Sequence, residues 1–152
     1  MCSKKICLIS SSGGHFEQLL TLKKLKKNFD IYVVTEKTDY FEKTKGVYYI
    51  QQVNRREKIF LFRMVIVFFQ SLRIFIKEKP DVIISTGALS VIPTFLIGKL
   101  FGKKLIFIES FAKISTPTLT GKFVYRFVDK FFIQWAELKK IYPDAICLGS
   151  IY

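Results

Sequence analysis

Residues 80–90 read PDVIISTGALS, and this stretch predicts the fold more directly than any other segment. A proline and an aspartate precede the apolar run Val82-Ile83-Ile84, and a Thr-Gly pair follows its last serine. A short, continuous apolar run between turn residues is typical of a parallel strand that is covered on both faces. We therefore expect a buried strand at 81–85 and a loop at 86–90.

Similar apolar runs alternate with helical patterns on both sides of this segment. The pattern predicts strands at 6–10, 31–35, 47–51, 105–109, 130–134 and 145–148. It predicts helices at 16–27, 57–78, 90–100 and 120–127, with a helical turn between the last two strands. Such alternation is typical of an α/β fold, so we expect residues 1–152 to form a single Rossmann-like domain with a mostly parallel sheet.

Composition narrows the class of protein. Half of the 152 residues are hydrophobic, and 16 are phenylalanine, which excludes a disordered chain and suggests apolar surface for a membrane or a partner. Cys2, Cys7 and Cys147 are odd in number and form no Cys-x-x-Cys pair, which argues against a disulfide framework or a metal site. We expect no cofactor, no signal peptide and a reducing cytoplasm.

The formal net charge is +13, and much of it comes from lysine pairs spread along the chain. Such a balance favours phosphate-rich partners: nucleic acid, anionic lipid or nucleotide-like ligands. The alternative is that these pairs only form a solvated surface.

The loop at 10–15, SSSGGH, joins the first predicted strand to a helix. Gly13 and Gly14 allow a tight turn, and the free N–H groups of the helix favour an anion, with Ser11 and Ser12 as additional donors. The loop lacks the Gly-x-Gly-x-x-Gly spacing of dinucleotide sites and the lysine of a P-loop. A plain glycine turn is the alternative.

His15 is the only histidine and stands at the start of that helix. A helix N-terminus disfavours the imidazolium form, so a neutral ring there can accept a proton. We therefore consider His15 as a catalytic base, or as a donor to a bound diphosphate. A structural or merely exposed histidine is the alternative.

Two more loops follow predicted strands. Thr86 and Gly87 form a second glycine break before a helix, placed to share a diphosphate with the first loop. Glu109 and Ser110 end the strand at 105–109, where the glutamate can act as a base or receive a sugar hydroxyl. A helix cap or a salt bridge is the alternative for Glu109.

The predicted helix at 57–78 is almost wholly apolar between Ile59 and Ile76. Arg56, Arg63, Gln70 and Lys77 recur every seven residues as one narrow polar stripe, with Arg73 beside it. The run is shorter than the ~20 residues of a typical membrane span and contains charges. We expect the helix to lie against a bilayer. The alternative is burial against another subunit. The predicted membrane residues are Phe60, Phe62, Arg63, Phe68, Phe69 and Arg73.

Several motifs occur together in order: SGGH at 12–15, STG at 85–87, FIESFAK at 107–113, TGK at 120–122, Gln134-Trp135, and Tyr142-Pro143. With these motifs the chain resembles the acceptor-binding, membrane-anchoring subunits of bipartite GT-B glycosyltransferases. That family includes bacterial capsule and exopolysaccharide proteins and the eukaryotic anchor subunit that builds dolichol-linked chitobiose. A more distant resemblance is to the N-terminal half of the transferase that makes peptidoglycan lipid intermediates.

The resemblance implies the N-terminal half of a GT-B fold. It implies a separate donor-binding catalytic subunit that supplies the UDP-sugar, and a polyprenyl-diphosphate-linked sugar as acceptor, undecaprenyl diphosphate in bacteria. It places the partner interface at Gln134, Trp135, Gly149, Ile151 and Tyr152. Eukaryotic members carry an N-terminal transmembrane anchor that this sequence lacks, so we expect peripheral attachment to the cytoplasmic face of the plasma membrane.

Two other functions would each explain some of these residues. A self-sufficient nucleotide-binding enzyme would need the dinucleotide fingerprint, and no acidic residue closes the second strand before Glu36. A basic nucleic-acid or membrane-binding module would explain the charge. Nucleic acid does not explain the apolar breadth of the long helix, so we expect no nucleic-acid partner.

Overall fold

The computed structural model describes residues 4–39 and 44–152. In that part of the chain seven strands form one parallel sheet in the order β3-β2-β1-β4-β5-β6-β7. The strands are β1 (Lys5–Ser10), β2 (Asp30–Glu36), β3 (Val47–Ile50), β4 (Val82–Ser85), β5 (Lys104–Ile108), β6 (Lys130–Ile133) and β7 (Ile146–Cys147). The predicted Rossmann-like sheet is confirmed.

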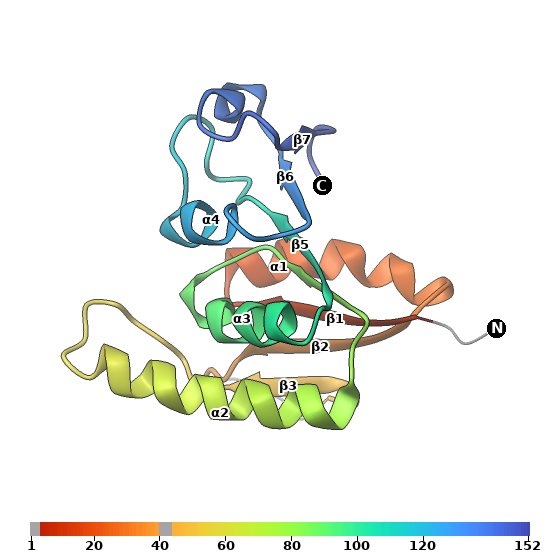
Figure 1. The fold of residues 1–152 in the computed structure, drawn as a ribbon, viewed down its shortest axis with the longest axis vertical. Coiled ribbons are helices and arrows are strands. Elements are labelled where there is room, and N and C mark those ends of the chain that lie inside the picture. Colours follow the sequence, from red (N-terminus) through yellow and green to blue (C-terminus); the bar gives the residue numbers. More distant parts are fainter. Residues whose placement is uncertain (1–3, 40–43) are drawn as a thin grey trace.

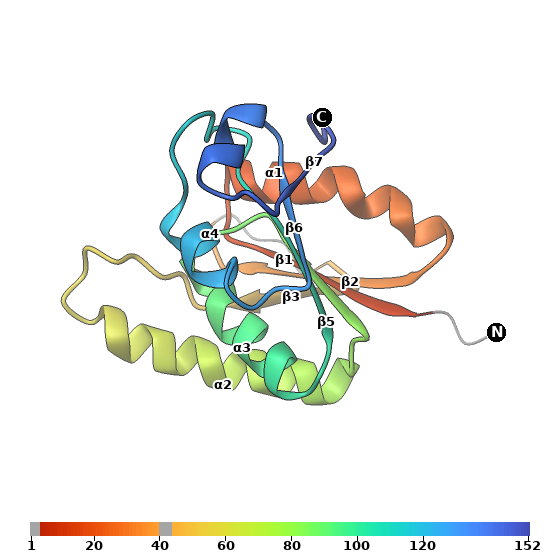
Figure 2. The same cartoon turned by 45° about the horizontal axis from the view of Figure 1, so that its top comes forward.

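Helices cover both faces of the sheet (Figures 1 and 2). The α-helices are α1 (Gly14–Thr21), α2 (Phe60–Glu78), α3 (Ile92–Leu100) and α4 (Leu119–Val124), and the 3₁₀ helices are η1 (Leu22–Lys27), η2 (Leu89–Val91) and η3 (Ala136–Lys140). Leu19 of α1 packs with Leu8 on one face. Val67 of α2 and Phe95 of α3 pack with Ile83 on the other. Side chains of every central strand are therefore buried from both sides, as continuous apolar runs require.

Some helix ends differ from the prediction. The expected helix at 16–27 becomes 3₁₀ after Thr21, and the one expected from residue 57 begins at Phe60. The short α4 begins at Leu119 because the Thr118 hydroxyl accepts the Gly121 amide at 2.8 Å. Helix α2 ends where Lys79 adopts φ 49° directly before Pro80, since a proline disfavours helical backbone in the residue before it.

The strand order indicates at which edge of the sheet a ligand would bind. Strand β1 pairs with both β2 and β4, so the chain reverses its direction of travel across the sheet at this point. Ser10 is in register with Thr35, and Ile9 with Ser85, so these strands end side by side. Ligands of open parallel sheets bind at the carboxyl ends of strands where the order reverses. The loops after β1, β2 and β4 therefore define the region to inspect.

Candidate functional site

The two glycine loops touch each other at the carboxyl edge. The Ser11 amide donates to the Gly87 carbonyl at 2.9 Å. The Thr86 hydroxyl donates to the His15 carbonyl at 2.7 Å, and His15 Nδ1 lies 2.7 Å from the Thr86 carbonyl oxygen. The structure thus brings the loops predicted from residues 11–15 and 86–87 into one site.

These contacts define the orientation of the His15 ring. A carbonyl oxygen only accepts, so Nδ1 carries the hydrogen that it donates to Thr86, and Nε2 is not part of this bond. Gly87 has φ 104°, and a Cβ placed on it would lie 3.1 Å from the ring. Glycine is needed at 87 because the backbone is left-handed and because the imidazole packs against it. The Thr86 carbonyl and Gly87 therefore fix the position of the His15 ring.

The first turn of α1 leaves amide groups available. Gly13 is the N-cap residue, and no side chain caps the helix. Its carbonyl accepts the amides of Phe16 and Glu17, whereas the amides of Gly14 and His15 have no acceptor within the described residues. Free N–H groups at a helix N-terminus favour an anion. The predicted anion site thus has its donors in place.

Ser12 differs from its expected role as a free donor. Its amide and its hydroxyl both donate to Glu36 Oε2 at 3.3 Å. Glu36 is the last residue of β2, and its side chain links the first glycine loop to the loop after β3 through the Val53 amide, also at 3.3 Å. In the sequence Glu36 is only an imperfect dinucleotide signal, but in the structure it joins two loops at this edge.

Glu109 is enclosed by the protein, which does not fit its predicted role as a base or as an acceptor for a sugar hydroxyl. Glu109 is 0% exposed. Its carboxylate accepts the Ser110 amide at 2.9 Å, the Thr118 hydroxyl at 2.9 Å and the Tyr142 hydroxyl at 2.9 Å. Burial and the nearby Glu109 carboxylate raise the pKa of Tyr142, so the phenol keeps its proton and donates. The geometry supports the alternative role, in which Glu109 organises the start of α4.

The neighbouring polar residues are also internal. Ser110 is buried, with its amide directed to Glu109. Gln134, predicted at the partner interface, is buried as well: its amide nitrogen donates to the Glu109 carbonyl at 2.9 Å and its oxygen accepts the Ile151 amide at 3.2 Å. Gln18 of α1, which the sequence analysis missed, lies 3.4 Å from the Gln134 nitrogen. Gln134 thus connects the core to the C-terminal segment instead of facing outward.

The C-terminal segment borders an apolar groove. The Trp135 indole donates to the Phe111 carbonyl at 2.7 Å, and the Phe111 ring packs against both Trp135 and Tyr152. Beside these rings lies a groove of about 290 Å³, on the sheet face that α1 and η1 only partly cover. Its lining is almost entirely apolar, from Leu22, Ile84, Ile106, Ile108, Phe132, Ile133, Gln134 and the segment 148–151. The predicted interface residues Gly149 and Ile151 line this groove.

Helix α2 exposes its apolar side. Leu61 and Phe62 are 76% and 66% exposed, and Val65, Phe69 and Ile76 also face solvent with Arg73 among them. Phe60 and Phe68 are only half-exposed, and Phe68 packs against the core. Among the described residues, no helix is long and apolar enough to cross a bilayer.

The polar stripe of α2 points elsewhere than predicted. Arg63 pairs with Glu57 at 2.9 Å, Gln70 accepts the Gln51 amide at 2.7 Å, and Lys77 lies over the Tyr48 ring. These partners belong to β3 and the loop after it, so the stripe satisfies polar groups at the edge of the sheet. Arg63 therefore forms an ion pair within the chain, whereas Arg73 lies on the exposed face of the helix.

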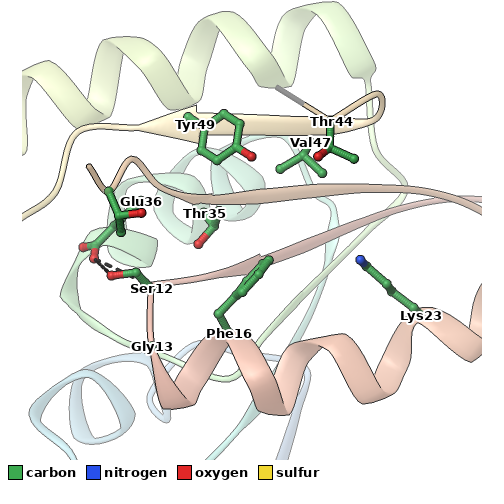
Figure 3. A pocket seen from close by; sticks show the side chains of 10 residues that line it. Ser12, Gly13, Phe16, Lys23, Thr35, Glu36, Thr44, Val47 and Tyr49 are labelled. Carbon is green, nitrogen blue, oxygen red and sulfur yellow. Dashed lines mark hydrogen bonds between the residues drawn. The ribbon is translucent and has the colours of Figure 1, made fainter. Parts of the chain in front are cut away.

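Two polar cavities adjoin the first glycine loop. One, of about 370 Å³, lies at the carboxyl edge and is lined by Ser11, Ser12, Glu36, Gln52, Val53, Asn54, Arg55, Ala88 and Leu89. The other, of about 400 Å³, runs between α1 and β3 and is shown in Figure 3. Arg55 was missed, although a cation in a loop after a strand is a signal for phosphate. In residues 4–39 and 44–152 no group of His, Cys, Asp and Glu gathers to hold a metal ion.

The sequence is similar to known oligosaccharide biosynthesis proteins. A family model described as "Oligosaccharide biosynthesis protein Alg14 like" matches residues 52–151. The human UDP-N-acetylglucosamine transferase subunit ALG14 is 26% identical over 180 residues, which cover 98% of this chain and 83% of the human protein. The corresponding subunit of Schizosaccharomyces pombe is 36% identical over 77 residues, or 47% of this chain and 37% of that protein.

Solved structures show the fold alone. MurG of Acinetobacter baumannii superposes with a TM-score of 0.68 at 17% identity, over 86% of this chain and 41% of that one. The UDP-GlcNAc 2-epimerase of Methanocaldococcus jannaschii gives 0.73 at 13% identity, over 96% and 45%. The chain thus spans less than half of each of these two proteins. With two thirds of its length matched by the family model, the chain belongs to the Alg14-like family of oligosaccharide biosynthesis proteins.

Proposed function

We propose that this chain is one subunit of a two-protein glycosyltransferase, in which it binds a polyprenyl-diphosphate-linked sugar and positions it for a separate UDP-sugar-binding subunit. The observation that carries the proposal is the joint site of the two glycine loops. There the amides of Gly14 and His15 have no acceptor within the described residues, and Thr86 holds the His15 ring. Ser11 and Ser12 of the same loop line a polar cavity. Donors for phosphate and an acceptor for a proton are the two elements that a glycosyl acceptor of this class needs.

In this proposal the diphosphate of the acceptor binds at the start of α1. Helix N-terminal amides and an arginine are preferred partners of phosphate oxygens. The amides of Gly14 and His15 supply the first, and Arg55 in the same region supplies the second. Neither the Ser12 amide and hydroxyl nor the Ser110 amide is needed as a donor, since these groups are engaged with carboxylates.

His15 is the proposed catalytic base. Its Nδ1–H bond to Thr86 holds the ring so that Nε2 is the basic atom. In direct displacement, the acceptor hydroxyl attacks the anomeric carbon of the donor sugar, its proton passes to Nε2, and UDP leaves with the electron pair of the broken bond. Glu109 takes no part in this step because its carboxylate is enclosed.

The donor half is assigned to a partner that docks at the apolar groove beside residues 148–151. The relatives reported above are named as subunits of UDP-N-acetylglucosamine transferases. The groove leaves an apolar face of β5 and β6 open, which a complementary apolar surface would close. Trp135 and Tyr152 follow the groove residues Gln134 and Ile151 in the chain, and both rings pack against Phe111. Such aromatic residues are the kind that dominate interfaces.

Membrane attachment is assigned to the exposed side of α2, as peripheral binding at the cytoplasmic face. Leu61, Phe62 and Phe69 present contiguous apolar surface, and Arg73 can reach anionic headgroups. Single exposed apolar residues are normal on a protein surface, but here several lie on one side of the same helix. Binding here would hold the chain beside its lipid-linked substrate.

Transfer in reconstituted membranes tests the proposal. This chain alone, the candidate partner alone and both together are assayed with UDP-N-acetylglucosamine, UDP-glucose and UDP-galactose. The acceptors carry either undecaprenyl diphosphate, as in capsule and exopolysaccharide synthesis, or dolichyl diphosphate. Transfer only by the pair is the expected result. Full transfer by this chain alone would contradict the division into two subunits, and loss of transfer confined to partner-free samples would support it.

A further inference from the structure

We infer that the groove between α1 and β3 holds the sugar ring of the acceptor, the hexose attached directly to the diphosphate, and thereby sets acceptor specificity. This inference rests on the proposed function. The groove is the cavity of about 400 Å³ in Figure 3, which lies within the usual size range of ligand sites. Ser12 and Gly13 line its end, so it opens directly from the proposed diphosphate site.

An unsatisfied hydroxyl lines this groove. Thr35 on β2 is 4% exposed, and its Oγ1 has no hydrogen-bond partner within the described residues. Figure 3 shows this oxygen directed from β2 toward the space above Phe16. A buried hydroxyl without a partner costs free energy, so native proteins retain few of them without a reason. A ligand hydroxyl in the groove would give Thr35 the partner that the protein does not.

Glu36 next to it is also incompletely satisfied. The residue is 6% exposed, and its carboxylate accepts three hydrogen bonds that are all 3.3 Å long. A carboxylate can accept about four hydrogen bonds, and charge-assisted ones are normally shorter than these. No cation lies within ion-pair distance of Glu36 in the described part of the chain. Its oxygens are therefore suited to accept hydroxyl donors from a ligand.

The remaining walls favour a sugar ring. Phe16 projects from α1 on one side and Tyr49 from β3 on the other, with Thr38 and Lys23 also in the lining. Aromatic surface with a few polar groups at defined positions is the usual composition of a small-molecule site. A pyranose combines apolar C–H faces with hydroxyls that both donate and accept, which matches Phe16 together with Thr35 and Glu36.

A nucleoside is the competing occupant. An acidic residue at the end of the second strand, after a glycine loop, is the position that holds ribose hydroxyls in dinucleotide sites. Ser12 and Glu36 line both this groove and the cavity at the carboxyl edge, so the two cavities adjoin each other. Since the donor nucleotide is assigned to the partner, the vicinal hydroxyls expected here are those of the acceptor sugar.

Thr35→Val in the two-subunit complex is the first test. Because Thr35 Oγ1 has no partner to lose, the thermal unfolding temperature should not fall, which separates this effect from misfolding. The KM for a farnesyl-diphosphate-linked hexose should rise about 3- to 10-fold, the value of one hydrogen bond, with kcat and the KM for UDP-sugar unchanged. Thr21→Val in α1, outside the groove, is the matched control and should leave both KM values unchanged.

Glu36→Gln and a sugar-free inhibitor complete the test. Glu36→Gln should raise the acceptor KM by 10-fold or more, whereas Asp30→Asn at the other end of the same strand should not. Farnesyl diphosphate without a sugar should inhibit wild type and Thr35→Val equally.

An unchanged acceptor KM in both groove variants, with transfer intact, would overturn this inference but not the proposed function. A raised KM for UDP-sugar would assign the groove to a nucleoside and also overturn it. No transfer by the wild-type pair would overturn the proposed function and this inference with it.

Discussion

The carboxyl edge of the sheet has a closed half and an open half. In the closed half, after β5, Glu109 is fully buried, and short hydrogen bonds from Ser110, Thr118 and Tyr142 enclose it. In the open half, after β1, β2 and β4, Glu36 makes three long bonds and borders two cavities. Two glutamates at equivalent ends of strands thus have opposite roles, because different segments pack over them.

The largest expected effect is on stability in the closed half. Glu109→Ala removes the acceptor of several buried donors, so the free energy of unfolding should fall by about 3 kcal/mol. Glu36→Ala should cost about 1 kcal/mol or less, since its bonds are long and water can enter the cavities. Urea denaturation of both variants measures the difference. Equal losses would remove the distinction between the two halves.

The second effect is on catalysis in the open half. His15→Ala should lower the kcat of the complex about 10²-fold with little change in stability, because it removes the proposed base. His15→Gln keeps a donor for the Thr86 carbonyl but has no basic nitrogen, so it should be equally slow. A Gln variant with wild-type kcat would assign His15 to positioning or phosphate binding. Steady-state rates at saturating acceptor separate these outcomes.

The third effect is expected where the two glycine loops meet. Gly87→Ala places a Cβ 3.1 Å from the His15 ring on a left-handed backbone. It should cost about 1–2 kcal/mol of stability and reduce transfer by displacing the imidazole. Gly102→Ala is the matched control, since Gly102 has φ 64° but open space around its Cβ position. It should show a similar thermal shift with normal transfer, and equal activity of the two variants would count against the packed ring.

The smallest effect is expected at the opposite edge of the sheet. The Leu105 amide, with help from Lys104, holds the pKa of Asp129 below its usual range. A lowered pKa in the folded state stabilises the protein at neutral pH, and this contribution is lost as pH falls below about 4. Asp129→Asn should therefore flatten the fall in thermal stability between about pH 5 and 3, by less than about 1 kcal/mol. Parallel curves for wild type and variant would contradict this.

Much of the fold follows from local patterns. The apolar runs at Val82–Ser85 and Lys104–Ile108 and the glycine break at residues 86–87 were enough to predict strands, their parallel pairing and the edge that carries the loops. The ends of helices were less predictable. The start of α4 depends on the Thr118 hydroxyl, and the shift of η1 to 3₁₀ geometry has no signal in its lysine-rich sequence that we can identify.

In the candidate site, too, some residues were predictable from local sequence and others were not. His15 and the loops at Gly13 and Gly87 were found from residue type and position, because a helix N-terminus and a glycine turn are local features. Arg55 and Thr35 were missed: Thr35 belongs to no recognisable motif, and a single cation in a loop after a strand, as at Arg55, is only a weak signal. Gln134 was predicted at the partner interface and Arg63 at the membrane. In the structure both side chains instead bind residues of this chain, Gln134 the Ile151 amide and Arg63 the Glu57 carboxylate.

The class of fold, the succession of strands and helices, the family and the candidate loops could all be predicted from the amino-acid sequence. Each of these depends on neighbours along the chain, through hydrophobic periodicity and turn residues. Which strand-end carboxylate is enclosed and which borders a cavity could be seen only in the folded chain. Besides its neighbour Ser110, the partners that enclose Glu109 are 9 and 33 residues away in the chain, and the partners of Glu36 are 17 and 24 residues away. Burial and hydrogen bonding are set by packing between distant segments, so the same residue type acquired two different roles.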